Sequence, residues 1–327
     1  MRIGTIGSGA IAAQFIAAVQ ATPGMEVTTV CSREKIRAEE FARQMGVVKA
    51  SCDYVSMLTD DDIDAVYIAS PNSLHFNHCR QALEAGKHVI CEKPFTSTAA
   101  ELRELIALAK KQRLMLFEAI SIIYMPNFSL IRQYLPMLGR IRMVQCNYSQ
   151  YSSKYPAFLD KRQPNVFNPA FSGGALMDIN VYNLHFLCEL FGAPEEVSYQ
   201  ANLCDGIDTS GIVTLRYPDF VAVCSGAKDS FSLNFAQIQG EKGYLNVVGG
   251  INGCSQIHLQ TAHETTSLNA QLAQNRLLPE VDAFRKTLTQ QDYAHCYSRL
   301  EHSLRVMTLL DAARLSAGII FPADTLK

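Results

Sequence analysis

Short apolar runs alternate with helical patterns along the first 120 residues of the chain. Each run is four or five residues long, which is typical of strands that are buried on both faces of a sheet. Regular alternation of such strands with helices predicts a parallel, doubly wound sheet, and therefore an α/β fold. The expected strands are Arg2–Ile6, Glu26–Val30, Ala65–Ala69, His88–Cys91 and Leu114–Phe117, and the expected helices include Ile11–Val19, Ile36–Met45 and Thr98–Gln112.

The rhythm changes after Glu118 and Ala119, where longer strand-like runs joined by short turns replace the alternation. This pattern predicts an α+β domain around a large, mainly antiparallel open sheet. Helices should cover one face of that sheet and leave the other face available to a partner subunit. The expected strands are Arg140–Tyr151, Glu196–Leu203, Ile212–Tyr217, Val221–Ser225, Phe231–Gln239 and Tyr244–Val248, and a helix is expected over Asn127–Leu135.

A glycine-rich turn follows the first strand directly and opens the first helix. Gly7 permits a tight turn, Gly9 lets the backbone approach a pyrophosphate, and Ala12 stands where a third glycine would pack helix against strand. The helix N-terminus adds free N–H groups and the positive end of the helix dipole. We therefore predict a dinucleotide-binding Rossmann domain over residues 1–120 and a substrate-binding and oligomerisation domain over residues 121–327. The residues expected to hold the dinucleotide in this turn are Gly7, Ser8, Gly9, Ala10 and Ile11.

The end of the second strand should select the cofactor. An acidic residue there would hold the ribose 2′-hydroxyl of NAD, but the chain carries Ser32 and Arg33, with Arg37 one turn further on. A hydroxyl and two guanidinium groups suit the 2′-phosphate of NADP, which is the favoured cofactor. NAD stays an alternative because Glu34 is close by. In a purely structural alternative, Arg33 and Arg37 lie on an exposed helix start and pair with Glu34 or Glu40.

The strand His88–Cys91 ends abruptly in Glu92, Lys93 and Pro94. Ligands bind at the carboxyl ends of the strands in open α/β sheets, so a lysine at this point, with its path fixed by the following proline, is a candidate functional group. The alternative is a surface lysine in an ordinary turn between strand and helix. Glu92 and Lys93 are candidates for cofactor contact, and Lys93 is also a candidate for catalysis.

The turn after the strand Ala65–Ala69 should lie at the same edge of the sheet as the glycine turn. Ser70, Pro71 and Asn72 form this turn, and His75 begins the helix behind it. Their position makes all four residues candidates for cofactor contact. For His75 the alternative is a capping role within the turn of the helix.

Gly173 and Gly174 open a second distinctive stretch, which we predict to be helical. Asp178, Tyr182 and His185 fall at positions i, i+4 and i+7 of this helix and therefore share one stripe of its surface. A row of Asp, Tyr and His between apolar faces favours the lining of a cleft, where such side chains transfer protons and bind substrate. The alternative is a polar stripe on the exposed face of an amphipathic helix.

Composition and charge narrow the class of partner. A net charge of −2 and a pI near 6.4 give no basic surface for nucleic acid, and no apolar run is long enough to span a membrane. The ten cysteines are scattered without ligand spacing, which is typical of reduced thiols in a cytoplasmic protein and argues against structural zinc. We expect a small-molecule partner and no metal.

Together these motifs resemble the glucose-fructose oxidoreductase, inositol dehydrogenase and rhizopine-catabolism family (Gfo/Idh/MocA). The resemblance covers nearly the whole chain and rests on the glycine turn, on Ser70–Asn72 with His75, on Glu92–Pro94 and on Gly173–Asp178. It implies a Rossmann domain followed by an α/β domain whose open sheet forms homodimer or homotetramer contacts. It also implies oxidation or reduction of a sugar, polyol, diol or related carbonyl with a nicotinamide cofactor.

The resemblance also implies roles for single residues. Lys93 matches the lysine that contacts both the nicotinamide ribose and the substrate oxygen, and Asp178 matches the acid beside it. Many inositol-type members carry a histidine four residues after that acid. This chain has Tyr182 there, as in the branch that resembles dimeric dihydrodiol dehydrogenase and NADP-dependent D-xylose dehydrogenase. His185 and Asn180 depart from the pattern of that branch, which leaves the substrate open.

The expected reaction is reversible hydride transfer between nicotinamide C4 and a carbinol carbon, together with a group that exchanges the hydroxyl proton. Tyr182 is the first candidate because the Lys93 ammonium would stabilise its phenolate, with Asp178 holding Lys93 in position. His185 is the alternate acid/base or a substrate contact. Three alternatives stay open: a cofactor-dependent glycoside hydrolase, an imine or enamine reductase, and a non-catalytic NADP-binding regulator.

Overall fold

The computed structural model describes residues 1–271 and 275–325, which fall into two compact units. The first unit comprises Met1–Ile120 and Ala273–Leu304, and the second comprises Ser121–Leu272 and Arg305–Lys327. The chain passes from the first unit to the second after Ile120, and the segment that ends at Leu304 belongs to the first unit again. Its packing partners are far away in the sequence, so local patterns carry no signal for it.

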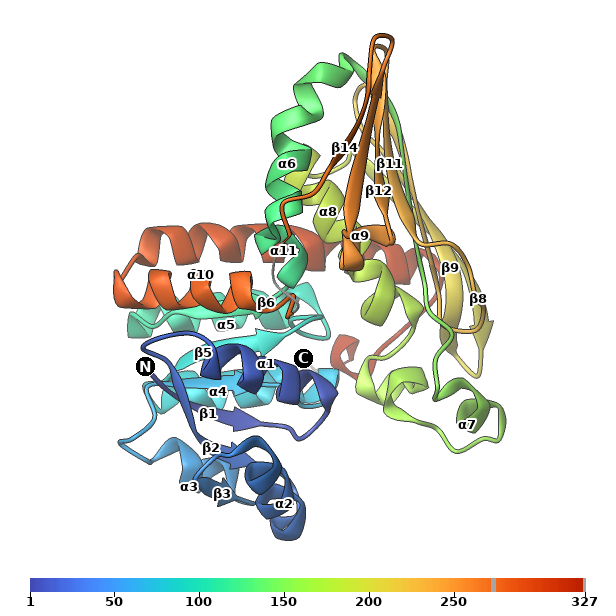
Figure 1. The fold of residues 1–327 in the computed structure, drawn as a ribbon. Coiled ribbons are helices and arrows are strands. Elements are labelled where there is room, and N and C mark those ends of the chain that lie inside the picture. The colour runs from blue at the N-terminus through green and yellow to red at the C-terminus, as the bar shows by residue number, and fades with distance from the viewer. Residues whose placement is uncertain (272–274, 326–327) are drawn as a thin grey trace. The chain divides into compact units, whose positions relative to one another are not determined.

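The first unit contains a six-stranded, fully parallel sheet in the order β3-β2-β1-β4-β5-β6 (Figure 1). The strand order reverses between β1 and β4, which is the switch point where sheets of this kind bind ligands. β4 and β6 are buried along their whole length, β4 with a continuous apolar sequence and β6 with Glu118 among apolar residues. The strands are β1 (Arg2–Ile6), β2 (Glu26–Cys31), β3 (Lys49–Ser51), β4 (Ala65–Ile68), β5 (His88–Glu92) and β6 (Leu116–Ala119).

Helices pack on this sheet and on one another: α1 contacts α2 and α10, and α4 contacts α5. Local sequence sets several of their ends. Thr98 and Glu101 form a capping box at the start of α5, and Gly46 ends α2 in the left-handed conformation. The helices are α1 (Ala10–Gln20), α2 (Lys35–Met45), α3 (Tyr54–Leu58), α4 (His75–Glu84), α5 (Ala99–Gln112), α10 (Leu278–Thr289) and the first part of α11 (Tyr293–Ser316).

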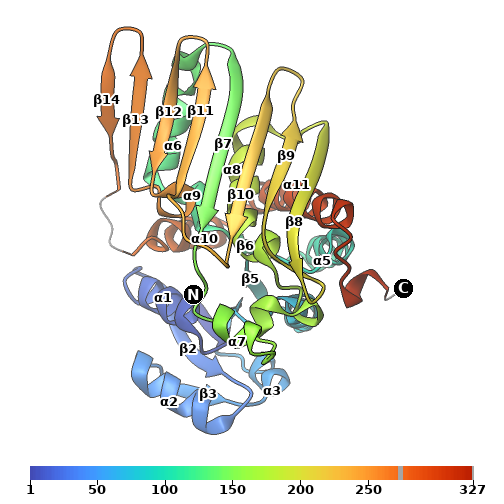
Figure 2. The same cartoon turned by 90° about the vertical axis from the view of Figure 1, so that its right-hand side faces the viewer.

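The second unit is built on an eight-stranded sheet in the order β14-β13-β12-β11-β7-β10-β9-β8 (Figure 2). Neighbouring strands are antiparallel except for β7 and β10, which run parallel. The predicted fold class is therefore confirmed: a parallel Rossmann sheet and a large, mainly antiparallel open sheet. The strands are β7 (Ile141–Ser149), β8 (Glu196–Cys204), β9 (Ile207–Arg216), β10 (Val221–Ala227), β11 (Phe235–Gly240), β12 (Gly243–Val248), β13 (Gln256–Thr261) and β14 (Thr265–Leu268).

One strand begins later than expected, because Phe231 lies in a loop and β11 starts at Phe235. Side chains replace the main-chain ladder in this loop. The Asn147 amide donates to the Leu233 oxygen at 2.5 Å, and the Asn234 side-chain oxygen accepts from the Ser149 N–H at 2.8 Å. A loop closed by asparagine side chains does not need the paired backbone of a strand.

The eight-stranded sheet has one covered face and one open face. Met143 and Val221 pair in register and are exposed, whereas their neighbours Val144 and Ala222 are buried. Figure 2 views the sheet from its open face, with α6 and α8 behind the strands. The helices of this unit are α6 (Pro126–Tyr134), α7 (Tyr155–Leu159), α8 (Val181–Phe191), α9 (Gly250–Gly253) and the remainder of α11.

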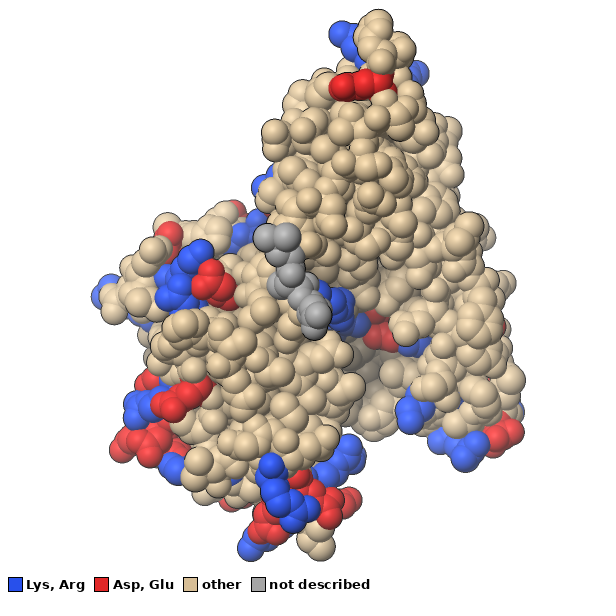
Figure 3. Space-filling model, viewed as in Figure 1, with Lys and Arg blue, Asp and Glu red and all other residues tan. Residues whose placement is uncertain are grey.

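Charge is distributed unevenly on the face shown in Figure 3. Acidic and basic side chains mix over the first unit, while the visible surface of the second unit is largely uncharged. Across the described residues, helices long and apolar enough to cross a membrane are absent. The same residues contain no group of three or more His, Cys, Asp or Glu side chains arranged to hold a metal ion.

Candidate active site

The glycine turn leads from β1 into α1, as the sequence predicted. Gly7 has a φ of 118°, and a Cβ at this position would lie 2.5 Å from the main-chain oxygen of Ala69. Only glycine meets both constraints. A Cβ on Gly9 would meet no atom within 4 Å, so the space in front of the α1 N-terminus, where Ala10 and Ile11 begin the helix, is open. The turn therefore fits a pyrophosphate bound by helix N–H groups.

The predicted 2′-phosphate residues lie directly after β2. Ser32 is 9% exposed, and its hydroxyl oxygen lies 3.4 Å from that of Ser8, so the structure brings these two residues together. Arg33 and Arg37 are exposed. Among the described residues, no ion pair joins either arginine to Glu34 or Glu40. The structural alternative for the two arginines thus lacks its ion pairs, and both guanidinium groups are available to an anionic ligand.

His75 connects the turns that follow β4 and β5. Its Nδ1 lies 2.9 Å from the Pro94 oxygen and its Nε2 lies 2.9 Å from the Ser70 oxygen. Burial lowers the pKa of His75, while hydrogen bonding to these carbonyls acts in the opposite direction. Asn72 begins a short 3₁₀ turn ahead of α4, and Pro71 precedes it, partly exposed. The contacts of His75 give it a positioning role between the two turns.

Lys93 stands at the carboxyl end of β5, half-buried, directly after Glu92. Glu92 is 8% exposed and accepts a 2.5 Å hydrogen bond from the Tyr67 hydroxyl. Burial raises the pKa of Glu92, although Tyr67 and Lys93 both favour its ionised form. The strand therefore ends in a carboxyl group anchored in the core, followed by a lysine that reaches partial exposure.

Sequence reasoning missed the buried acids that accompany Glu92. Glu118 on β6 is 5% exposed and Glu280 on α10 is 1% exposed. Burial raises the pKa of Glu280 well above its ordinary value, the charges of Glu92 and Glu118 add to this effect, and Arg276 opposes it. Glu280 could not be placed from the sequence because α10 joins the first unit through long-range packing.

Two glycines and a distant aspartate set the start of the predicted site helix in the second unit. A Cβ on Gly173 would lie 2.7 Å from two main-chain oxygens, and a Cβ on Gly174 would overlap the carboxylate of Asp208. Asp208 is 1% exposed and accepts hydrogen bonds from the Leu176 N–H at 2.6 Å and the Tyr199 hydroxyl at 2.7 Å. This buried acceptor, which sequence reasoning also missed, satisfies a free N–H group at the helix start.

The helix begins with a π-helical turn, Leu176–Asn180, before α8 continues. Such turns are rare and occur frequently at functional sites. The Asn180 amide donates to the Cys224 oxygen at 2.9 Å, and the Asn183 amide donates to the Asn180 side-chain oxygen at 2.8 Å. These buried amides fix the wide turn against β10, which explains Asn180, a residue that the sequence left without a role.

The exposed fraction of the side chains falls along the predicted polar stripe, from Asp178 to His185. The Asp178 side chain is 31% exposed, Tyr182 is 7% exposed and His185 is 0% exposed. The Tyr182 ring packs edge to face on Tyr148 of β7, with ring centres 5.8 Å apart. The exposed-stripe alternative therefore does not describe this helix.

Lys228 is a further charged residue that sequence reasoning missed. It follows β10 directly, is 5% exposed, and donates a hydrogen bond to the carboxylate of Asp178. Its Nζ also lies 5.6 Å from the centre of the Phe167 ring. A buried ammonium is costly unless it is paired, so this contact stabilises the ionised form of Asp178 within its own unit. Asp178 is fifty residues away in the sequence, which no motif spans.

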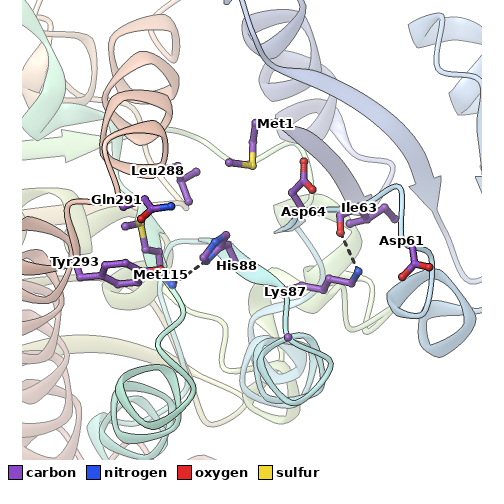
Figure 4. A pocket seen from close by; sticks show the side chains of 11 residues that line it. Met1, Asp61, Ile63, Asp64, Lys87, His88, Met115, Leu288, Gln291 and Tyr293 are labelled. Carbon is purple, nitrogen blue, oxygen red and sulfur yellow. Dashed lines mark hydrogen bonds between the residues drawn. The ribbon is translucent and has the colours of Figure 1, made fainter.

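A pocket of about 470 Å³ lies at the other end of the parallel sheet, where its strands begin (Figure 4). Lys87 donates there to the main-chain oxygens of Asp60 and Ile63, and His88 Nδ1 accepts from the Met115 N–H at 2.9 Å. The pocket contains none of the predicted cofactor or catalytic residues. Its lining consists of Met1, Asp61, Ile63, Asp64, Gly86, Lys87, His88, Met115, Leu288, Gln291 and Tyr293.

Family models match both units of the chain. Residues 1–120 match the Gfo/Idh/MocA model described as an oxidoreductase family with an NAD-binding Rossmann fold. Residues 136–246 match the model of the Gfo/Idh/MocA C-terminal domain.

Individual relatives span the whole chain. The sequence is 38% identical to the uncharacterized oxidoreductase YgjR of Escherichia coli, over 100% of this chain and 99% of that protein. It is 34% identical to scyllo-inositol 2-dehydrogenase (NADP(+)) IolU of Bacillus subtilis, over 99% of each chain. Among solved structures, the 3-ketoreductase KijD10 of Actinomadura kijaniata, in complex with NADP and TDP-benzene, aligns with a TM-score of 0.83 at 25% identity over 97% of each chain.

Gly7 and Gly9 should respond differently to alanine. Gly7→Ala should lower the free energy of unfolding by about 1–3 kcal/mol, because the side chain strains a positive φ and meets Ala69. Gly9→Ala should keep the melting temperature of the free protein but weaken NADP binding, because its Cβ enters the open space. Thermal unfolding with and without NADP measures both effects. Unchanged NADP affinity in Gly9→Ala would exclude a pyrophosphate from this turn.

Removal of Asp178 should destabilise the second unit by leaving Lys228 as an unpaired buried cation. We expect Asp178→Ala to lower the free energy of unfolding by about 1–3 kcal/mol, less than for a fully buried pair because solvent reaches the carboxylate. Adding Lys228→Met should recover most of the loss. Lys161→Met, which breaks the exposed pair with Asp205, serves as the control and should have no measurable effect. Denaturant unfolding at pH 7 decides; no recovery in the double variant would contradict the pairing.

Proposed function

Because the chain belongs to the Gfo/Idh/MocA oxidoreductase family, we propose that it transfers a hydride between a nicotinamide cofactor and a carbinol or carbonyl carbon of a sugar, polyol or diol. The observation that carries the proposal is the arrangement of the parallel sheet. The open glycine turn after β1 and Lys93 after β5 both stand at carboxyl ends of its strands. The inositol and ketone substrates of the named relatives support the substrate class.

We propose NADP as the cofactor, with NAD as the alternative. The turn at Gly7 and Gly9 would hold the pyrophosphate, and Ser32 with Arg33 would receive the 2′-phosphate, because a hydroxyl and a free guanidinium lie where NAD enzymes place an acid. Bound cofactor supplies or accepts the hydride. Two relatives named with NADP support this choice. The remaining contacts are proposed for Ser8, Ala10, Ile11, Arg37, Ser70, Pro71, Asn72, His75, Glu92 and Lys93.

In the proposed reaction Lys93 polarises the substrate oxygen and Tyr182 exchanges the hydroxyl proton. An ammonium stabilises the charge that develops on an alkoxide, and proton transfer by a positioned side chain contributes roughly 10²- to 10⁴-fold in rate. Asp178, held ionised by Lys228, orients the polar groups around the substrate. We prefer Tyr182 to His185 for proton exchange because His185 is completely enclosed in the second unit.

We also propose a cytoplasmic location and assembly into a homodimer or homotetramer. All ten cysteines are free, which suits a reducing compartment. The open face of the eight-stranded sheet carries the exposed apolar side chains Met143, Ile212, Val221 and Tyr244, whose burial against another subunit would be favourable. Sheets of this kind usually leave one face to solvent or to a partner.

Hydride transfer can be tested by following absorbance at 340 nm with NADP and a panel of inositols, aldoses and trans-diols. Lys93→Ala should lower kcat by orders of magnitude while NADP affinity changes little, because the charge acts mainly on the developing alkoxide. Tyr182→Phe removes a single oxygen and should also lower kcat strongly, whereas His185→Asn should retain turnover.

Three results would contradict this assignment. Near-normal turnover in Lys93→Ala would remove that residue from the chemistry. Activity that persists in Tyr182→Phe and disappears in His185→Asn would reverse the order of the acid/base candidates. Cleavage of glycosides without net change in absorbance would favour the hydrolase alternative.

Cofactor preference should depend on Arg33. Loss of a charge-assisted contact with the 2′-phosphate should weaken NADP binding by about ten- to a hundredfold in Arg33→Ala and leave NAD binding nearly unchanged. Arg43→Ala, which removes the same charge from the far end of α2, is the matched control. Both cofactors should be titrated at one salt concentration because such contacts are screened. Equal losses for NADP and NAD would refute the assignment.

A further inference from the structure

A series of aromatic rings connects Lys228 with the surface of the second unit. The Lys228 Nζ lies over the ring of Phe167. The centre of that ring is 5.6 Å from the ring of Tyr155, which is 5.8 Å from the ring of Tyr151. Tyr151 in turn stacks on Phe231, with centres 4.9 Å apart and planes inclined by 10°. The rings therefore pack in an unbroken series from the buried Phe167, beside the partner of Asp178, to Phe231 at the surface.

The outer end of this series is exposed. Phe231 is 83% exposed although one face of its ring is stacked on Tyr151, so the opposite face is available to a ligand. A single exposed apolar side chain needs no explanation in a globular protein. Phe231 differs from a single exposed side chain, because its ring is the outermost member of an aromatic series that starts beside the Lys228–Asp178 ion pair.

The loop that carries Phe231 is held in place on both sides. The Asp229 carboxylate accepts hydrogen bonds from the hydroxyls of Thr209 at 2.7 Å and Ser210 at 2.8 Å. On the other side, the Asn147 amide donates to the Ser232 hydroxyl at 2.9 Å. Folding therefore already restricts this loop, and a ligand that binds to the ring loses little affinity through ordering it.

We propose that Tyr151 and Phe231 form an outer subsite for a second ring of the substrate, joined to the ring that carries the reacting carbinol. The occupant is the C–H face of a second sugar or an aryl group, since flat aromatic surfaces bind such groups through dispersion and burial of apolar area. Phe231 is three residues beyond Lys228, so the Cα atoms of the two residues lie at most about 10 Å apart. This inference rests on the proposed function, because it extends the site of Asp178 and Tyr182.

The absence of tryptophan from the sequence makes the subsite directly observable. Phe231→Trp keeps an aromatic platform and introduces a single fluorophore. With oxidised NADP bound, its emission should change saturably on addition of the phenyl β-D-glycosides of glucose, galactose or xylose, with an affinity about tenfold higher than for the methyl glycosides. Leu233→Trp places the same fluorophore at an 86% exposed position of the same loop and should not respond.

Turnover provides the second measurement. Phe231→Ala should lower kcat/KM for phenyl glycosides about tenfold more than for the parent sugars, and Leu233→Ala should lower neither. The subsite is refuted if none of the phenyl glycosides changes the emission of Phe231→Trp, or if Leu233→Trp responds equally. It is also refuted if the emission of Phe231→Trp changes with protein concentration, in parallel with the molecular mass in solution, and not with ligand concentration. Phe231 would then be a subunit contact.

The two proposals fail separately. A saturable fluorescence response without hydride transfer to any sugar would refute the proposed reaction and retain the subsite. Turnover of sugars without a fluorescence response would do the reverse.

Discussion

Close contact between neighbouring strands at their carboxyl ends fixes the positions of the candidate site residues in the first unit. The Gly7 N–H donates to the Cys31 oxygen at 3.0 Å, and the Ala69 N–H donates to the Ile6 oxygen at 2.9 Å. The turn after β1 is therefore tied to both neighbouring strands, and Gly7 has no room for a side chain. Because this turn is fixed, the N-terminus of α1, the turn bridged by His75 and the half-buried Lys93 occupy defined places at one edge of the sheet.

In the second unit, buried side chains fix the start of the site helix. This helix starts with a π turn, and the first N–H of that turn has no partner within the helix. Asp208 accepts from this N–H, Asn180 joins the turn to the Cys224 oxygen of β10, and Lys228 pairs with Asp178. Such pairs offset part of the cost of burying polar groups. The arrangement thus combines a fixed backbone with one partly exposed carboxylate.

Carboxyl groups near the candidate site residues lie in contrasting electrostatic surroundings. In the first unit Glu92, Glu118 and Glu280 are buried together, and burial favours the neutral form of Glu92 and Glu280. In the second unit Asp178 lies against the Lys228 ammonium, which favours its ionised form. The surroundings therefore favour the neutral form of some carboxyl groups and the ionised form of another, although the sequence alone does not distinguish them.

Sequence alone was sufficient for features that depend on neighbouring residues. Continuous apolar runs and longer strand-like runs predicted the two sheets, and the glycines at positions 7, 173 and 174 marked turns that the structure requires for steric reasons. The short edge strands β3 and β14, and β13 beside β14, were not predicted, because half-exposed and largely polar sequences carry little apolar signal. The tertiary structure decided the rest. Lys228, Asp208 and Glu280 acquire their roles from contacts with residues far away in the chain, and the depth at which His185 lies depends on packing from all sides. Local periodicity contains no information about such contacts, because burial and charge pairing are properties of the folded chain.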